Sequence, residues 1–285
     1  MNTNTIKNTK NFMLLVSVNH ANPNGDPRRE NEPRVDAIDN KGFITDVCIK
    51  HKVRTYQSIA TNDNVFVVAQ EDSKEPTCKS LQEKYKKTVT ESGKSGVEAL
   101  CDKYIDVRQF GAVCAFSSTK SDDSVALSLR GPITIQQAYS VDPVELETVQ
   151  ITKCINGADA KDSKGKDTMG TKKAVRYGLY VIKGSVNAYF AEKTGLTEED
   201  VEKFKTALLH MFDFDGAVAR PDGAIVIEKA YWWEHNGKTP NVPLKKLYDT
   251  VQIKKKDGVD YPASFADYEV TVTDNPTVPV TVLFE

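Results

Sequence analysis

The sequence predicts an α+β fold, and three observations carry that prediction. Short apolar segments with strand character occur near the N-terminus, in the middle and towards the C-terminus. Two other segments place their apolar residues at helical spacing, and long polar stretches separate these elements. Hydrophobic residues are 39% and charged residues 27% of the 285 residues, which supports a packed core and excludes a wholly disordered chain.

The N-terminal region predicts a strand, a basic loop and a helix, in that order. Residues 12–18 are apolar and rich in β-formers, as expected of a buried strand. Residues 22–34 are rich in Asn, Gly, Pro and Arg, a composition typical of turns. From Thr45, a suitable N-cap, apolar residues recur at close to helical spacing as far as Ala60.

The middle of the chain changes character twice. Residues 62–104 are polar and predict an inserted, partly helical subdomain. Strand character returns in residues 105–117 and again in residues 127–135, where Gly131-Pro132 predicts an edge or a bulge rather than a central strand.

Two strands, residues 148–154 and 174–183, flank the most basic loop of the chain. This loop, residues 155–173, contains Lys161, Lys164, Lys166, Lys172 and Lys173. Long polar loops of this kind often carry function.

The C-terminal part predicts a helix from Thr197, a strand at residues 224–231, a short helix at 244–251 and a terminal strand or strand pair at 268–284. The order of elements is compatible with a ferredoxin-like or RRM-like core with large insertions, although propensity alone does not establish that topology.

The charge distribution favours phosphate binding in two places, although the net charge is only −2. Residues 1–60 carry nine Lys and Arg against six Asp and Glu, and residues 150–190 carry eight against three. A local basic strip can hold phosphates on an otherwise acidic protein. The alternative is that both segments are ordinary solvated surface.

Other classes of protein lack support in the sequence. The five cysteines are odd in number and without C-x-x-C spacing, so we expect free thiols rather than a disulfide framework or a zinc site, and no cofactor. Residues 1–11 lack the features of a signal peptide, and no apolar run approaches the ~18 residues of a membrane span. We therefore expect a cytoplasmic protein without a membrane partner.

Phosphate binding would use the basic residues of the chain, whereas catalysis would need an acid, a base or a metal ligand. Arginines and lysines contact phosphates, and Lys50 and Arg54, four residues apart, share one helix face. Met169, at the tip of the basic loop, is either a wedge between bases or a hairpin residue that packs on a neighbour. An enzyme would need Asp26 as acid, base or metal ligand, or His20 as a base, but both residue types are common in turns and after strands. No G-x-S-x-G or H-E-x-x-H motif is present.

Seven segments together resemble the Csd/Csh family of CRISPR-associated proteins, backbone subunits of type I Cascade complexes within the RAMP superfamily. In chain order they read NPNGDPRRENEPRVD (22–36), GFITDVCIKHKVR (42–54), DVRQFGAV (106–113), RGPITIQQAYSVDPV (130–144), MGTKKAVRYGLY (169–180), AEKTGLTEED (191–200) and ALLHMF (207–212). The first is the most specific.

The resemblance implies an RRM-like palm, a helical fingers insertion and a β-hairpin thumb. In this sequence the palm would be residues 1–61 with 105–150 and 174–285, the fingers residues 62–104, and the thumb residues 151–173. Family members polymerise head to tail along a CRISPR RNA, within type I-C Cascade for the Csd type, and present the guide to a target DNA strand. Other Cascade subunits would be further partners.

The resemblance also implies an RNA-binding set drawn from the first loop, the first helix, the palm and the thumb. It comprises Asn22, Asn24, Gly25, Arg28, Arg29, Arg34, Lys50, His51, Arg54, Arg108, Gln109, Met169, Lys172, Lys173 and Arg176. Type I backbone subunits are regarded as non-catalytic. Related type III subunits cut target RNA with an aspartate in an early loop, so a ribonuclease that uses Asp26 is the alternative function.

Overall fold

The computed structural model describes residues 4–116, 125–152 and 169–284, and for Met169 the backbone alone. Its elements, in chain order, are β1 (Lys10–Ala21), β2 (Gly25–Asp26), β3 (Glu32–Pro33), β4 (Lys41–Ile44), α1 (Asp46–Ala60), α2 (Leu81–Ser92), α3 (Gly96–Lys103), α4 (Ile105–Phe110), β5 (Gly111–Phe116), β6 (Val125–Arg130), β7 (Ile133–Ile135), β8 (Ala138–Pro143), β9 (Leu146–Thr152), β10 (Met169–Val186), α5 (Ala188–Thr194), α6 (Glu198–His210), β11 (Ile225–Glu234), α7 (Leu244–Tyr248), β12 (Val251–Lys255), β13 (Tyr268–Val272) and β14 (Val280–Phe284).

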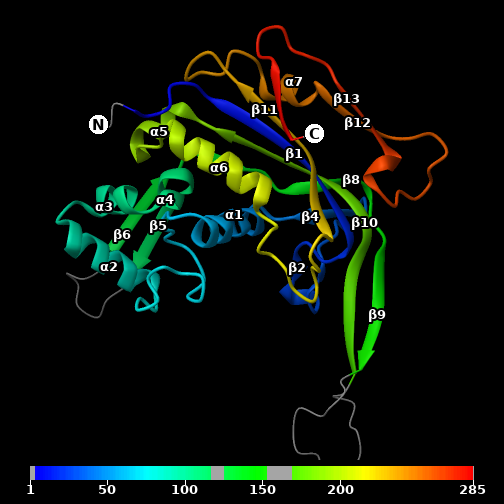
Figure 1. Cartoon of the computed structure of the whole chain (residues 1–285), viewed down its shortest axis with the longest axis horizontal. Helices are drawn as coiled ribbons and strands as arrows, with labels where there is room; N and C mark the ends of the chain where they lie inside the picture. Colours follow the sequence, from blue (N-terminus) through cyan, green and yellow to red (C-terminus); the bar gives the residue numbers. More distant parts are fainter. Residues whose placement is uncertain (1–3, 117–124, 153–168, 285) are drawn as a thin grey trace, which may run out of the picture.

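A central antiparallel sheet organises the chain, and the predicted α+β class is confirmed. The strands run in the order β14-β11-β1-β10-β8-β4, and β7 and β9 also pair with β10 (Figure 1). In the middle, Leu14 of β1 lies opposite Ile182 of β10 on one side and Ala230 of β11 on the other.

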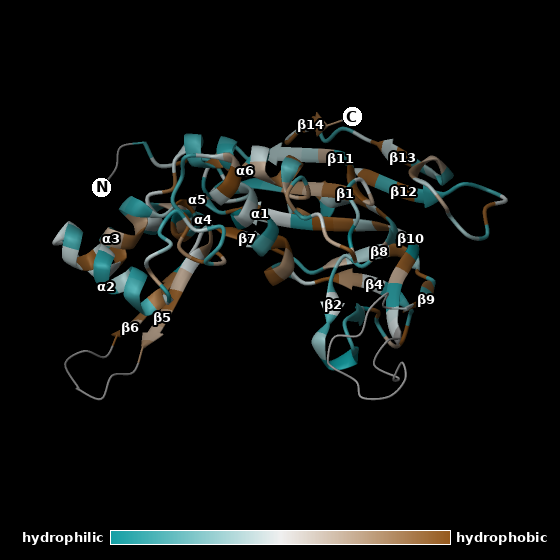
Figure 2. Ribbon diagram, turned by 60° about the horizontal axis from the view of Figure 1, so that its bottom comes forward, coloured by the Kyte–Doolittle hydropathy of each residue, from teal (hydrophilic) through white to brown (hydrophobic). Residues whose placement is uncertain are grey.

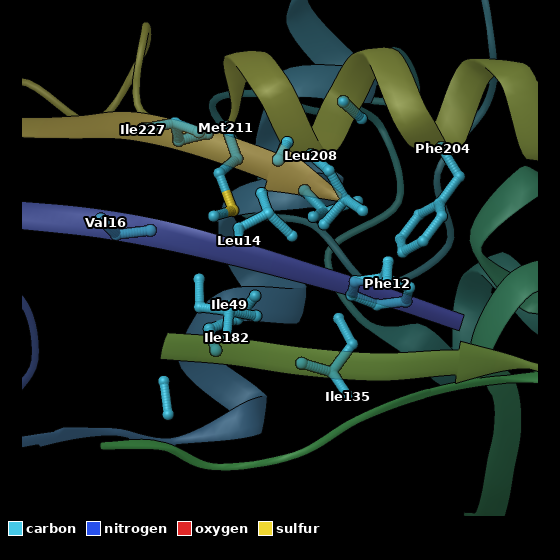
Figure 3. Packing of buried hydrophobic residues seen from close by; sticks show 14 of the residues in the cluster. Phe12, Leu14, Val16, Ile49, Ile135, Ile182, Phe204, Leu208, Met211 and Ile227 are labelled. Carbon is cyan, nitrogen blue, oxygen red and sulfur yellow. The ribbon is translucent and has the colours of Figure 1, made fainter. Parts of the chain in front are cut away.

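Both faces of β1 are buried along residues 12–16, which explains the unbroken apolar sequence of this part of the strand. Phe12, Leu14 and Val16 point to one face, where they pack with α1 and α6 (Figure 3). Met13 and Leu15 point to the other face, which α7, β12 and β13 cover. Because successive side chains of a strand alternate, a strand covered on both faces needs apolar residues at every position.

The two principal helices begin where the sequence predicts. The side chain of Thr45 accepts a hydrogen bond from the backbone N–H of Cys48 and caps α1. Thr197 and Asp200 form a reciprocal capping box at the start of α6. Both helices pack on the same face of the sheet, since Ile49 of α1 and Phe204 of α6 belong to one apolar cluster.

The clusters on the two faces of the sheet form the first core, and a second core, one further apolar cluster, lies beside the sheet; the chain around it differs from one prediction. Residues 62–104 contain α2 and α3, as expected of a partly helical insertion. Residues 105–117 were predicted as a strand, but Ile105–Phe110 is the helix α4 and the strand begins only at Gly111. The apolar spacing of Ile105 and Val107 suits a strand, yet packing of Val107 against Leu100 and Tyr104 overrides that local preference.

The hairpin β5–β6 packs with this second core, through Cys114, Phe116 and Leu127. The strands β5 and β6, assigned to the palm in the sequence, therefore pack with α2 and α3. The helix α4 bridges the two cores, since Val107 belongs to the second core and Phe110 packs against the first.

The strands β9 and β10 form an arm that projects beyond the sheet (Figure 1). The predicted pair of strands is confirmed, but residues 169–173, expected in the loop, already belong to β10, with Lys172 opposite Val149. These polar residues tolerate a strand because the arm is largely exposed and pairing with β9 satisfies the backbone. The predicted loop lysines Lys161, Lys164 and Lys166 lie outside the described residues.

Towards the C-terminus the predicted elements are present with shifted boundaries. The helix expected at residues 244–251 ends at Tyr248, and β12 begins at Val251. None of the described helices is both long and apolar enough to cross a membrane.

Candidate nucleic-acid interface

The loop between β1 and β4 is held in a fixed shape by its asparagines. The side chain of Asn22 is buried and donates to the backbone carbonyl of Asn31. Glu30 and Asn31 both adopt left-handed backbone conformations, which turn the chain back on itself. A Cβ on Gly25 would lie 3.0 Å from the carbonyl oxygen of Asn31, so the close approach of the two strands favours glycine there.

Asn24 ties the same loop to the first helix. Its Oδ1 accepts hydrogen bonds from the backbone N–H and from the hydroxyl of Thr45, both at 3.0 Å. Because Thr45 caps α1, the loop and the start of the helix form one unit.

Three arginines of this loop differ in what they can contact. Arg28 and Arg29 lie in a short 3₁₀ turn, and their side chains are 89% and 61% exposed. Arg34 is mostly buried, 3.8 Å from Asp26, and its Nε has no hydrogen-bond partner in the described part of the chain. Arg28 and Arg29 each lie near one carboxylate, Asp26 at 4.0 Å and Glu32 at 3.6 Å, but both side chains stay exposed, with Arg34 behind them.

The base of the arm lies against this loop. Lys173 of β10 is 3.8 Å from Oε1 of Glu32, and Oε2 of the same carboxylate is 3.6 Å from Arg29. Lys172, the residue before it in β10, is half-buried, and because successive side chains of a strand alternate it points to the other side of the strand. The loop of residues 22–34 and the described base of the arm thus meet in space, and Figure 2 colours the loop around β2 as hydrophilic.

Other candidate residues, on β1, the arm and α1, form ion pairs or hydrogen bonds with nearby side chains. Arg176 lies 3.3 Å from Glu145 and stays exposed, and His20, with a left-handed backbone, is hydrogen-bonded to Glu147. Lys50 pairs with Asp46 one turn before it, at 2.9 Å. The structure describes the backbone of Met169 but not its side chain.

Arg54, Arg108 and Gln109 act as internal anchors. Arg54 is only 13% exposed, donates to the fully buried Asp106 at 2.9 Å and lies over the ring of Phe110. Arg108 forms a bidentate pair with Asp200, with distances of 2.9 and 2.8 Å.

Gln109 is fully buried and bonds to Gln57 and to the backbone of Asp200. Arg54 therefore does not share an open face with Lys50. These three residues join α1, α4 and α6 through hydrogen bonds and ion pairs.

Asp26 has a local role in the loop. Its Oδ1 accepts from the backbone N–H of Arg28 at 3.0 Å and so caps the short 3₁₀ turn. Across residues 4–116, 125–152 and 169–284, no three His, Cys, Asp or Glu residues converge as a metal site would require. The cysteines Cys48, Cys78, Cys101 and Cys114 are free thiols, as expected, and burial raises the pKa of Cys48.

Two basic residues that the sequence did not single out lie beside this loop. Lys52 is buried in α1, and Arg220 belongs to the segment after α6; both pair with Asp215. Lys52 sits within a basic helix, but nothing local predicts that Arg220 folds back towards it.

The sequence matches the family model "CRISPR-associated protein Cas7" over residues 8–273. The chain belongs to the Cas7 family. The prediction of a CRISPR-associated backbone family within the RAMP group is confirmed. A Cas7 protein of Haloferax volcanii is 26% identical over 218 residues, which are 71% of this chain. The chain spans 63% of that relative's length.

Among solved structures, a chain of a CRISPR RNA-guided surveillance complex in a pre-nicking state is similar, with a TM-score of 0.50. The identity is 12%, and the match covers 89% of this chain and 84% of the other. This likeness shows a shared fold. A chain of another CRISPR RNA-guided surveillance complex matches with a TM-score of 0.47 and 12% identity, over 88% of this chain and 78% of the other.

Proposed function

We propose that this chain is the CRISPR RNA-binding backbone subunit of a type I-C surveillance complex. Copies assemble head to tail along the guide with other Cascade subunits and present it to a target DNA strand, without cutting nucleic acid themselves. Membership of the Cas7 family supports the proposal, as does the occurrence of the shared fold in a complex described as RNA-guided.

The observation that carries the proposal is the meeting of the loop with the arm. Glu32 lies between Arg29 and Lys173, so cations from residues 22–34 and from β10 form one basic surface. The exposed guanidinium of Arg28 extends that surface. Cations spaced along a surface suit the repeating phosphates of a nucleic-acid strand and give binding without sequence preference.

The fold supports an RRM-like palm within this function. The strands β11, β1, β10 and β8 are neighbours in that order, and α1 and α6 connect them on one face. This matches a β-α-β-β-α-β arrangement. We further propose that residues 62–104, together with β5 and β6, act as fingers and that residues 151–173 act as the thumb.

The test is binding of single-stranded RNA by fluorescence anisotropy over a range of salt concentrations. The double variant Arg28→Glu with Arg29→Glu should bind more weakly than the wild type. Its salt dependence should also be shallower, because each lost phosphate contact lowers the slope by about 0.7 for a single strand. The matched control is Lys254→Glu with Lys256→Glu, an equal change of charge at exposed positions in and directly after β12.

Equal loss of binding in both double variants would show a general effect of net charge and contradict the assignment of the loop. Unchanged binding in the Arg28 and Arg29 variant would contradict it as well.

A further inference from the structure

A small pocket lies beside the base of the arm. Its walls come from β8 and the turn after it, from β10, and from the loop between β12 and β13 (Figure 1). Its volume is about 50 Å³. One water needs roughly 10–15 Å³, so the pocket holds about four water-sized groups. That is the size of the head group of one side chain, far below the ~300 Å³ of a pocket for a drug-sized ligand.

Aromatic rings form much of the wall of this pocket. Tyr177 of β10 and Tyr268 of β13 are 8% and 6% exposed and belong to the apolar cluster that α7 covers. Tyr261, in the loop between β12 and β13, is 73% exposed. Tyrosine is enriched at interfaces because it offers a large apolar face together with a polar tip. The open ring of Tyr261 therefore suits contact with a group from outside the chain.

One buried hydroxyl in the wall lacks a partner. The hydroxyl of Tyr268 donates to Oδ2 of Asp142 at 2.9 Å. The hydroxyl of Tyr177 is also buried, but it has no hydrogen-bond partner within residues 4–116, 125–152 and 169–284. Buried hydroxyls are normally hydrogen-bonded, so an unpaired one in a pocket wall provides a polar position for a ligand.

The charged residues that line the pocket favour a cation. They are Asp142 and Glu145 against one cation, Arg176. Arg176 pairs with Glu145 at 3.3 Å, and their side chains are 63% and 53% exposed. An exposed ion pair of this kind is weak, so Glu145 can also balance a cation that enters the pocket.

More distant carboxylates act in the same direction. Burial raises the pKa of Tyr177, and the negative charges of Glu228 and Asp267 raise it further. The unpaired hydroxyl thus lies in a negative field. Such a field attracts cations and repels phosphates, which separates this pocket from the basic surface that suits RNA.

The walls of the pocket are held in place before any ligand arrives. Oδ2 of Asp267 accepts hydrogen bonds from the backbone N–H groups of Ala263 and Ser264, at 2.8 and 2.9 Å, and so fixes the loop that carries Tyr261. A Cβ on Gly178 would lie 2.9 Å from Cγ1 of Val144, so glycine lets the turn after β8 approach β10 closely. A preformed pocket lowers the entropic cost of binding.

Among cations, a guanidinium fits these features best. It is planar, has four atoms without hydrogen, stacks on aromatic faces and carries several N–H donors. An ammonium is a compact and strongly hydrated point charge, which uses an aromatic face less well.

We propose that this pocket binds the guanidinium of an arginine side chain from a partner protein. The guanidinium lies against the ring of Tyr261, donates to the hydroxyl oxygen of Tyr177, and has its charge balanced by the carboxylates of Asp142 and Glu145. The proposal goes beyond RNA binding, because it uses tyrosines and carboxylates of the chain rather than its cations.

A second copy of this chain is a poorer occupant than a different protein. Each arginine of the chain already contacts a carboxylate or an aromatic ring. These contacts are Arg28–Asp26, Arg29–Glu32, Arg34–Asp26, Arg54–Asp106, Arg108–Asp200, Arg130–Phe190, Arg176–Glu145 and Arg220–Asp215. An arginine of a second copy would have to leave its own contact, whereas a different partner has no such cost.

The first test measures binding of N-acetyl-arginine methylamide to the full-length protein by saturation-transfer NMR. The matched probe is the citrulline analogue, which has the same length but a neutral head group. The arginine probe should bind about tenfold more tightly, because a hydrogen bond to a charged group is stronger than one to a neutral group. Equal binding of the two probes, or no binding of either, would overturn the guanidinium site.

Variants of the tyrosines test the assignment of the walls. Tyr177→Phe should weaken binding of the arginine probe by about tenfold or more and leave the melting temperature unchanged or higher, since the lost hydroxyl has no partner in the free protein. Tyr261→Ala should weaken binding by about two- to fivefold, as expected of one exposed cation–π contact. Tyr189→Ala is the matched control, because Tyr189 is 57% exposed and lies outside the pocket. Wild-type affinity in Tyr177→Phe would contradict the assignment.

The second test identifies the occupant in the natively purified complex. Tyr177→Phe combined with Tyr261→Ala should reduce the amount of one other protein subunit, measured by mass spectrometry, with unchanged RNA content. Wild-type subunit composition would overturn the partner protein as occupant. Loss of self-association in its place would make a second copy the occupant and contradict the proposal as well. Binding of RNA by the double variant should equal that of the wild type, so the pocket and the proposed function can fail separately.

Discussion

The bidentate pair between Arg108 and Asp200 should be a structural bond between α4 and α6, and its removal tests that role. Arg108→Ala leaves the carboxylate of Asp200, which is 5% exposed, without its main partner. Removal of one partner of a buried ion pair costs about 3–5 kcal/mol. We expect about 3 kcal/mol, at the low end, because Asp200 keeps a hydrogen bond from the backbone N–H of Thr197.

For a chain of this size, about 3 kcal/mol corresponds to a fall of roughly 6–12 °C in the melting temperature. Thermal unfolding followed by circular dichroism measures it. The control is Arg176→Ala, which breaks the exposed pair with Glu145 and should cost less than about 1 kcal/mol. If Arg108→Ala unfolds no earlier than this control but binds RNA more weakly, the anchoring role is refuted and Arg108 belongs to the RNA contacts.

Three further predictions concern the loop, the second core and catalysis. Asn24→Ala should lower the free energy of unfolding by about 1–2 kcal/mol in a denaturant titration, because Thr45 loses two hydrogen bonds; an unchanged midpoint would contradict the link between loop and helix. Burial raises the pKa of Glu75, but hydrogen bonds from Lys103 and the adjacent tyrosine outweigh burial and hold that pKa below its ordinary value. A carboxyl whose pKa is lower in the folded than in the unfolded protein stabilises the fold at pH values above its unfolded pKa of about 4.3. That stabilisation is lost as the pH falls through the folded pKa. The wild type should therefore lose more thermal stability below about pH 4.3 than Glu75→Gln, and parallel pH profiles would refute this. Asp26→Ala should leave a guide-complementary labelled RNA as intact as the wild-type complex does; cleavage that depends on Asp26 would establish the ribonuclease alternative.

Local signals predicted the elements that local interactions dominate. The strand segment of residues 12–16 is apolar at every position, and the caps Thr45 and Thr197 mark the starts of α1 and α6. The helix α4 was predicted as a strand because its alternating apolar residues suit a strand equally well. Only packing against the second core decides between helix and strand.

The sequence predicted the exposed arginines of the loop, but not the buried ion pairs between the helices. Arg28 and Arg29 are exposed in a turn, as the Pro-, Asn- and Gly-rich sequence indicated. Arg54 looked like a second row of phosphate contacts because it lies four residues after Lys50. Its partner Asp106 is 52 residues away in sequence, and no local pattern predicts such a pair.

The most direct test of the central claim is the nucleic acid that the protein retains when it is purified natively with its complex. The account predicts an absorbance ratio at 260 and 280 nm typical of a nucleoprotein, and sequencing of the bound RNA should return CRISPR repeats and spacers. Loss of that RNA should follow Arg28→Glu with Arg29→Glu, but not Lys254→Glu with Lys256→Glu. A protein free of nucleic acid, or one that retains RNA equally in both variants, would contradict the account.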